Sequence, residues 1–134
     1  MKSKILAFSL CALLCGRAAA QGTSDTLFVA FYNVENLFHP TNDSLTADDD
    51  FTPEGSYHWG YKRYFKKINN IAKVLIAMGK GSPPGIVGVA EIENDRVLHD
   101  LCRRSPLQKF SYRFVHHDSP DRRGVDVALL YRDS

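Results

Sequence analysis

The chain is poor in cysteine and has no apolar run long enough to cross a membrane. Its 134 residues contain three cysteines, and Cys11 and Cys15 lie in an N-terminal segment with the features of a cleaved leader. Cys102 is then left without an intrachain partner, which excludes a small disulfide-bonded scaffold. The uncharged run at residues 5–15 is too short to span a bilayer. Internal repeats and low-complexity tracts are also lacking, so collagen-like and coiled-coil chains are excluded.

The N-terminal segment has the order of a secretory signal peptide. A short basic start precedes the uncharged run, and small residues follow in an A-x-A pattern that ends at Ala20. This order predicts a signal peptide at residues 1–20. It leaves one domain at residues 21–134 and predicts a secreted or periplasmic protein. The alternative is an amphipathic or buried N-terminal helix.

An excess of charge of one sign is lacking once this leader is set aside. The whole chain has 17 Lys and Arg against 15 Asp and Glu. The leader holds Lys2, Lys4 and Arg17 and no acidic residue, so 14 basic residues remain against 15 acidic ones, a net charge of −1. The composition therefore gives no electrostatic case for a protein that coats nucleic acid or a membrane surface.

What the sequence does contain is an alternation of apolar strands and amphipathic helices. Strands are predicted at 27–33, 86–91, 110–117 and 125–131, and helices at 61–78 and 95–104. Gly79 ends the first helix, and Asn94 caps the second, in whose apolar stripe Cys102 lies. A strand, a helix and a strand form a crossover unit, so the first two strands should be parallel neighbours in an α/β fold.

Two patterns that could suggest metal sites are set aside. Residues 48–54, within a long polar loop at 39–59, have acidic residues spaced as in a calcium loop, but Pro53 takes the turn position that requires glycine. A solvated acidic loop is the favoured interpretation. His116 and His117 are adjacent on a strand, so their side chains point to opposite faces and cannot bind one ion together.

The ends of the first two strands are more informative. Asn33–Asn36 follows the first strand and Glu91–Asn94 the second, and ligands of open α/β sheets bind beyond the carboxyl ends of the strands. Glu91 ends an apolar run, where a carboxylate needs a partner. Magnesium fits, because it uses one or two carboxylates and completes its shell with water and phosphate. The alternative is that Asn33 and Glu91 only cap loops and helices.

Three motifs in order resemble the endonuclease/exonuclease/phosphatase family. They are Asn33–Phe38 (NVENLF), Val89–Asn94 (VAEIEN) and Asp118–Tyr131 (DSPDRRGVDVALLY). Asp49–Gly55 (DDFTPEG) is similar to a loop of the secreted bacterial branch. The resemblance covers nearly all of residues 27–132.

The resemblance implies a DNase I-like, four-layered α/β sandwich with a mixed sheet and flanking helices. It also implies cleavage of phosphoester bonds with a divalent metal, usually Mg²⁺, with Mn²⁺ as a second possibility. Glu91 matches the metal-binding glutamate of the family, and Asn33 matches the asparagine that supports the metal and the substrate phosphate. Arg63, Arg122 and Arg123 are candidates to bind phosphate; the alternative for them is ordinary surface charge or structural ion pairing.

Two further motifs of the family, Gly-Asp-x-Asn and Ser-Asp-His, are not found in residues 92–134. We therefore expect the N-terminal part of such a domain, truncated at Ser134, inactive alone and with one sheet face uncovered. The leading hypothesis is a secreted, metal-dependent hydrolase of the nuclease or phosphodiesterase kind, and the sequence does not choose between nucleic acid and a phosphorylated small molecule or lipid as its substrate. The alternatives are a hydrolase of phosphomonoesters or lipid phosphates, and a remnant that binds phosphorylated ligands without turnover.

Overall fold

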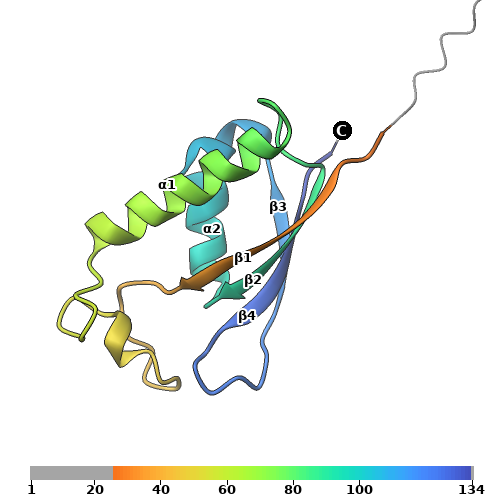
Figure 1. Ribbon diagram of the computed structural model, residues 1–134. Coiled ribbons are helices and arrows are strands. Elements are labelled where there is room, and N and C mark those ends of the chain that lie inside the picture. The colour runs from red at the N-terminus through yellow and green to blue at the C-terminus, as the bar shows by residue number, and fades with distance from the viewer. Residues whose placement is uncertain (1–25, 134) are drawn as a thin grey trace, which may run out of the picture.

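The computed structural model describes residues 26–133, so the predicted leader and its cleavage site lie outside the described residues. A mixed four-stranded sheet has the order β1-β2-β4-β3 (Figure 1). Its strands are β1 (Val29–Leu37), β2 (Ile86–Ile92), β3 (Arg113–His117) and β4 (Asp126–Tyr131). The helices are α1 (Tyr61–Met78) and α2 (Asp95–Arg103), with 3-10 turns η1 (Asp49–Phe51) and η2 (Pro106–Phe110). This mixed α/β arrangement confirms the predicted fold class.

The first two strands are parallel neighbours, as predicted, and α1 lies in the crossover between them. The predicted end of the first strand at residue 33 is wrong, however. The ladder with β2 runs to the pair Asn33–Ala90, is interrupted, and resumes at Leu37–Ile92. The interruption contains the buried Val34 and the polar residues Glu35 and Asn36, and the polar residues are why the sequence pattern suggested an end there.

Both predicted helices form, for the reasons that the pattern indicated. The buried face of α1 consists of Tyr64, Ile68, Ile71, Ala72 and Leu75, which recur at helical spacing. Asn94 caps α2 by accepting a hydrogen bond from the Val97 amide at 3.1 Å. Cys102 is fully buried, as expected for a small apolar side chain. Helix α2 ends at Arg103, one residue before the predicted end.

The strand predicted at 110–117 is too long at its start. Phe110 instead ends the 3-10 turn η2, which the Ser105 side chain caps and in which Pro106 takes a first-turn position. Ser111 then adopts a left-handed conformation with φ of 52°, and the strand begins at Arg113. The aromatic residues that suggested a strand here pack into the core from the turn: Tyr112 is fully buried.

The two faces of the sheet differ. Helices α1 and α2 lie on one side of it, where the buried core forms (Figure 1). The strand positions that alternate with the core carry exposed apolar side chains, namely Val29, Phe31, Val115, Val127 and Leu129. In residues 26–133 the structure thus shows two layers, with one apolar sheet face uncovered, as expected. No helix in this range is long and apolar enough to cross a membrane.

The long loop between β1 and α1 is packed at several points, although Asp49, Asp50 and Glu54 are exposed, as expected for a solvated acidic loop. Asp48 is fully buried and accepts a hydrogen bond from the Asp43 amide at 3.0 Å. Phe51 stacks on Phe38 with ring centroids 4.2 Å apart, and the Trp59 indole donates to the Phe38 carbonyl at 2.8 Å. The loop therefore forms a fixed wall beside the end of β1.

Candidate active site at the carboxyl ends of β1 and β2

Three segments meet at one end of the sheet. They are the carboxyl ends of β1 and β2, the long loop, and the hairpin between β3 and β4 (Figure 1). The Ala47 amide of the loop donates to the Arg122 carbonyl of the hairpin at 3.2 Å. The family-like motifs, far apart in sequence, are therefore adjacent in space.

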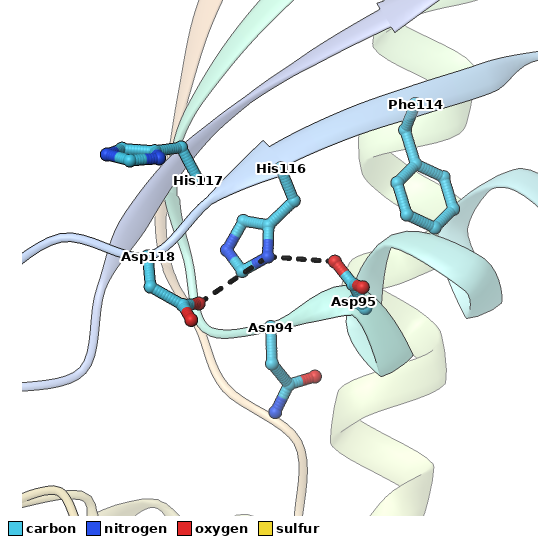
Figure 2. A pocket seen from close by; sticks show the side chains of 6 residues that line it. All are labelled: Asn94, Asp95, Phe114, His116, His117 and Asp118. Atoms are coloured by element: carbon cyan, nitrogen blue, oxygen red, sulfur yellow. Dashed lines mark ion pairs between the residues drawn. The ribbon is translucent and has the colours of Figure 1, made fainter.

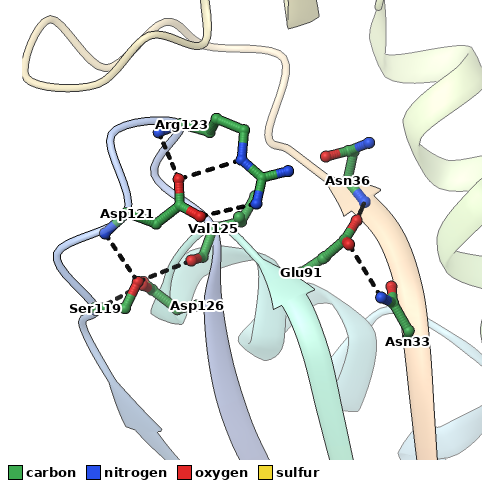
Figure 3. Close-up of polar contacts among 8 residues, drawn as sticks. All are labelled: Asn33, Asn36, Glu91, Ser119, Asp121, Arg123, Val125 and Asp126. Carbon is green, nitrogen blue, oxygen red and sulfur yellow. Dashed lines mark hydrogen bonds and ion pairs between the residues drawn. The ribbon is translucent and has the colours of Figure 1, made fainter.

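Glu91 lies at the centre of this end and is held as an ionised carboxylate (Figure 3). The Asn33 amide group donates to its Oε1 at 3.0 Å, and the Asn36 backbone amide donates to its Oε2 at 2.9 Å. The hydrogen bond from Asn33 is the main cause that lowers the pKa of Glu91; the Asn36 amide and the charges of Arg123 and Lys67 act in the same direction. The fold thus holds the Glu91 carboxylate in a fixed position at the sheet edge.

An irregularity in both strands turns Glu91 out of the core. Val87 and Val89 of β2 are buried, so regular alternation would bury residue 91 as well, yet Ile92 takes the buried position. The register shifts between residues 90 and 92, and Glu91 has a left-handed φ of 63°. Such a bulge re-aims a side chain. It costs about 1–3 kcal/mol per strained residue, which the surrounding contacts must offset.

The matching irregularity in β1 is held by a lysine of α1. Glu35 and Asn36 have left-handed φ values of 54° and 52°. The Lys67 ammonium donates to the carbonyls of both residues, to that of Asn36 at 3.4 Å. Burial lowers the pKa of Lys67, while Glu35 and Glu91 act to raise it. The sequence analysis missed this residue, because a lysine on an amphipathic helix has no signal that separates it from its exposed neighbours.

Asn33 links the two irregular segments. Its Nδ2 donates to Glu91, and its Oδ1 accepts a hydrogen bond from the Glu35 amide at 2.8 Å. Both ends of the side chain therefore orient Glu91, and the carbonyl oxygen keeps a second lone pair. The structure brings together the two residues that the sequence singled out; their catalytic and metal-binding roles stay a prediction.

The three candidate arginines occupy different places. Arg123 forms a two-pronged pair with Asp121, with Nε–Oδ1 at 3.2 Å and Nη2–Oδ2 at 2.8 Å, and it is close enough to help lower the pKa of Glu91 (Figure 3). Arg122 is exposed on the same hairpin. Arg63 is exposed on α1, and its guanidinium donates to the Tyr57 carbonyl. Arg123 is thus the arginine that the structure brings near Glu91.

A pocket of about 650 Å³ opens beside Glu91. Its lining consists of Asn33, Glu35, Asn36, Phe51, Tyr57, Lys67 and Glu91. The donor set fits Mg²⁺, which binds through one or two carboxylates and keeps open positions for water and phosphate. Phe51 and Tyr57 form an aromatic wall with ring centroids 4.9 Å apart. These rings were not predicted as site residues, although they come from the long loop that the sequence marked as a candidate for function.

Glu93, the second carboxylate of its motif, lies away from this pocket and is buried. It accepts a hydrogen bond from the His39 amide, and burial is the main cause that raises its pKa to about 7, with Asp48 and Asp43 adding to the effect. Burial also lowers the pKa of His39, whose Nδ1 accepts from the Thr41 amide at 3.1 Å. Glu93 therefore fixes the start of the long loop.

Comparison with known proteins gives a family match over most of the chain. A family model described as the endonuclease/exonuclease/phosphatase family matches residues 28–134. The chain is also similar to the protein translocase subunit SecA of Mycoplasmopsis pulmonis (strain UAB CTIP), with 30% identity over 89 residues, and to subunit SecA 1 of Clostridioides difficile (strain 630), with 26% over 105. These alignments cover 66% and 78% of this chain. The chain spans about a tenth of the length of these curated relatives (10% and 11%). No solved structure gives a significant match.

Proposed function

The chain belongs to the endonuclease/exonuclease/phosphatase family, and on this premise we propose that it is a metal-dependent phosphoester hydrolase that acts on phosphodiesters such as nucleic acid. Phosphoester hydrolysis is the activity that the family suggests in general, and its enzymes commonly use divalent metals. The fold, a mixed sheet with flanking helices, is consistent with a DNase I-like domain.

The observation that carries the proposal is the state of Glu91. Its carboxylate is ionised, half-buried, held by two hydrogen bonds and directed at an open pocket. Glu91 would hold Mg²⁺ or Mn²⁺, and Asn33 would keep the carboxylate in position. The metal, when bound, supplies positive charge for a phosphate oxygen and for the leaving group.

The neighbouring cations and rings suit a phosphorylated ligand. Arg123, fixed by Asp121, would attract the phosphate, and Lys67 would hold the bulged strand against the metal site. The wall of Phe51 and Tyr57 offers a surface on which a base or another planar group can stack. This wall is the reason to favour nucleic acid over the alternatives, a phosphomonoester or lipid phosphate, or binding without turnover.

Export is a second part of the proposal. The order of basic, apolar and small residues in 1–20 and the DDFTPEG loop both support a secreted or periplasmic protein of the bacterial branch. Mass spectrometry of the exported protein should find an N-terminus at Gln21. A soluble cytoplasmic product that retains Met1 would contradict this.

The substitution Glu91→Gln tests the metal site, because it keeps the shape of the side chain and removes its charge. We expect Mn²⁺ binding, followed by electron paramagnetic resonance, to weaken at least about tenfold. In a relative that also carries the Gly-Asp-x-Asn and Ser-Asp-His motifs, the matching substitution should lower Mg²⁺-dependent hydrolysis of bis(p-nitrophenyl) phosphate, with partial recovery at high metal concentration. Glu54→Gln, which neutralises an exposed carboxylate on the long loop, is the matched control.

Two outcomes separate the alternatives. In such a relative, Mn²⁺ binding that depends on the matching glutamate but gives no hydrolysis of the diester, of p-nitrophenyl phosphate or of DNA would favour the non-catalytic alternative. Hydrolysis of the monoester alone would favour a phosphatase. Equal Mn²⁺ affinity in the wild type and in Glu91→Gln would overturn the assignment of Glu91.

A further inference from the structure

A second cluster of metal-ligand side chains borders a pocket that shares no lining residue with the pocket at Glu91. His116 of β3 lies among three carboxylates: Asp95 at the start of α2 and Asp118 just after β3 (Figure 2), and Asp126 at the start of β4. His116, Asp118 and Asp126 each offer a ligand atom, and these three atoms lie within 4.8 Å of one another. None of these residues contacts Glu91 or Asn33 in the hydrogen bonds that hold the first site.

The contacts assign different roles to the two ring nitrogens of His116. The Nε2 atom lies 2.9 Å from Oδ2 of Asp126, a buried carboxylate whose other oxygen accepts from the Ser119 amide at 2.7 Å. Such a carboxylate accepts the Nε2 proton and fixes the tautomer, as partners of metal-binding histidines do. A neutral ring then has its lone pair on Nδ1.

The lone pair on Nδ1 faces two more carboxylates. Asp95 Oδ1 lies 2.8 Å from Nδ1, and Asp118 Oδ1 lies 3.7 Å from it. Figure 2 shows both contacts reaching the same nitrogen. The Nδ1 lone pair and the two carboxylates repel one another unless a positive charge lies between the nitrogen and the carboxylate oxygens. A proton on Nδ1 can satisfy Asp95 alone, because 3.7 Å is too long for a hydrogen bond to Asp118. A divalent ion could bind the nitrogen and both carboxylates.

The surroundings leave room for that ion and supply no competing cation. The cluster borders a pocket of about 640 Å³ lined by Asn94, Asp95, Phe114, His116, His117 and Asp118. Of the described residues that line it, none is lysine or arginine. The His116 side chain is largely buried, whereas those of Asp95 and Asp118 are 73% and 91% exposed. The two carboxylates can therefore close on an ion with little rearrangement of the fold.

We propose that His116, Asp95 and Asp118 form a second divalent-metal site, with Asp126 as the residue that positions the imidazole. One nitrogen and two carboxylates suit Zn²⁺ or a similar transition-metal ion, whereas Mg²⁺ prefers oxygen ligands alone. The site joins the start of α2 to both ends of the β3–β4 hairpin. Its bound ion stabilises the hairpin that carries Arg123, and the site takes no part in the chemistry at Glu91.

Titration of the whole chain with Co²⁺ and Zn²⁺ tests this site. We expect one Co²⁺ to give visible absorption bands and to be displaced by Zn²⁺ but not by excess Mg²⁺. Both His116→Gln and Asp118→Asn should weaken Co²⁺ binding about 10- to 100-fold. Asp118 is exposed, so its variant reports on binding even if the histidine variant folds poorly. Zn²⁺ should also raise the midpoint of thermal unfolding in the wild type and not in Asp118→Asn.

Two controls make the result specific. His99→Gln removes an exposed histidine of α2 that lines neither pocket, and should leave Co²⁺ affinity unchanged. Glu91→Gln should also leave it unchanged, so failure of the proposed hydrolase site and failure of this site are distinguishable. Equal Co²⁺ affinity in the wild type and Asp118→Asn would overturn the proposal and leave the contacts of His116 with its carboxylates as purely structural ones.

Discussion

Glu91 and Glu93 stand two positions apart in one motif, and the fold gives them opposite acid–base behaviour. Hydrogen bonds from Asn33 and Asn36 lower the pKa of Glu91, whereas burial raises that of Glu93 to about 7. The motif alone does not show which of the two glutamates faces the pocket and which is buried. The difference arises because the bulge at residue 91 directs one carboxylate outward and leaves the other beside the buried Asp48.

Glu93 should make stability depend on pH. Its pKa is raised from the ordinary value of 4.5 to about 7, so the folded state binds the proton more tightly than the unfolded chain does. The contribution of Glu93 to the free energy of unfolding is therefore fully present below about pH 4.5, and this contribution is lost as the pH rises through about 7. We expect urea midpoints to fall between pH 5 and 8 in the wild type and to fall less in Glu93→Gln. Parallel pH profiles in the two proteins would show that Glu93 is not the titrating group.

Asn33 is the residue whose removal should raise the pKa of Glu91. Its hydrogen bond is the first cause of the lowered value, so Asn33→Ala makes the carboxylate easier to protonate. The pH below which Mn²⁺ affinity falls should then be higher than in the wild type. At neutral pH the affinity should weaken less than in Glu91→Gln. Asn70→Ala, an exposed position on α1, is the control. If the pH dependence of Mn²⁺ affinity is the same as in the wild type, the lowered pKa of Glu91 is due to the backbone amide of Asn36 instead.

At the scale of elements, the cap of α2 can be tested directly. Asn94 accepts from the Val97 amide, and Asn94→Ala leaves that donor without its partner. Loss of an N-cap costs about 0.5–2 kcal/mol of unfolding free energy. Urea denaturation should show a lower midpoint with an unchanged slope. A midpoint equal to that of the wild type would mean that water replaces the cap at no cost.

Elements were predictable where periodicity or a cap was present. The apolar residues of α1 recur at helical spacing and Gly79 follows its last turn, so the helix was predicted at Tyr61–Met78 and observed there. The start of β3 was wrong because Phe110 and Tyr112 favour a strand locally, while Pro106 and the Ser105 cap favour a 3-10 turn. Aromatic content alone does not distinguish the two.

The candidate site was predictable only in part. Asn33 and Glu91 stood out because polar residues that end apolar strands mark the carboxyl edge of a sheet. Lys67 and Phe51 did not, because their positions beside the pocket depend on how α1 and the long loop pack. The cluster at His116 was missed for a related reason: the two adjacent histidines were considered together, whereas the contacts of His116 come from residues 95, 118 and 126.

For the whole molecule, the uncovered sheet face should govern self-association. Val115 and Val127 are 58% and 53% exposed on it, and Thr matches the branched shape of Val. We expect the double substitution Val115→Thr and Val127→Thr to reduce self-association in light scattering, because contiguous exposed apolar surface favours it. Unfolding free energy should change by about 0.5 kcal/mol or less per site. A large loss of stability would mean that this face is buried in the molecule as it exists in solution.

The parallel pairing of β1 with β2 has a consequence for the order of folding. The hydrogen bond from Asn33 to Glu91 joins residues 58 positions apart, and the intervening chain includes the long loop and α1. Contacts between residues so far apart in sequence form late in folding, because the chain loses the entropy of closing the loop before it gains the energy of the contacts. The sheet edge that carries Glu91 therefore has no precursor in local structure: it forms only when the crossover docks, and it is lost when the crossover detaches.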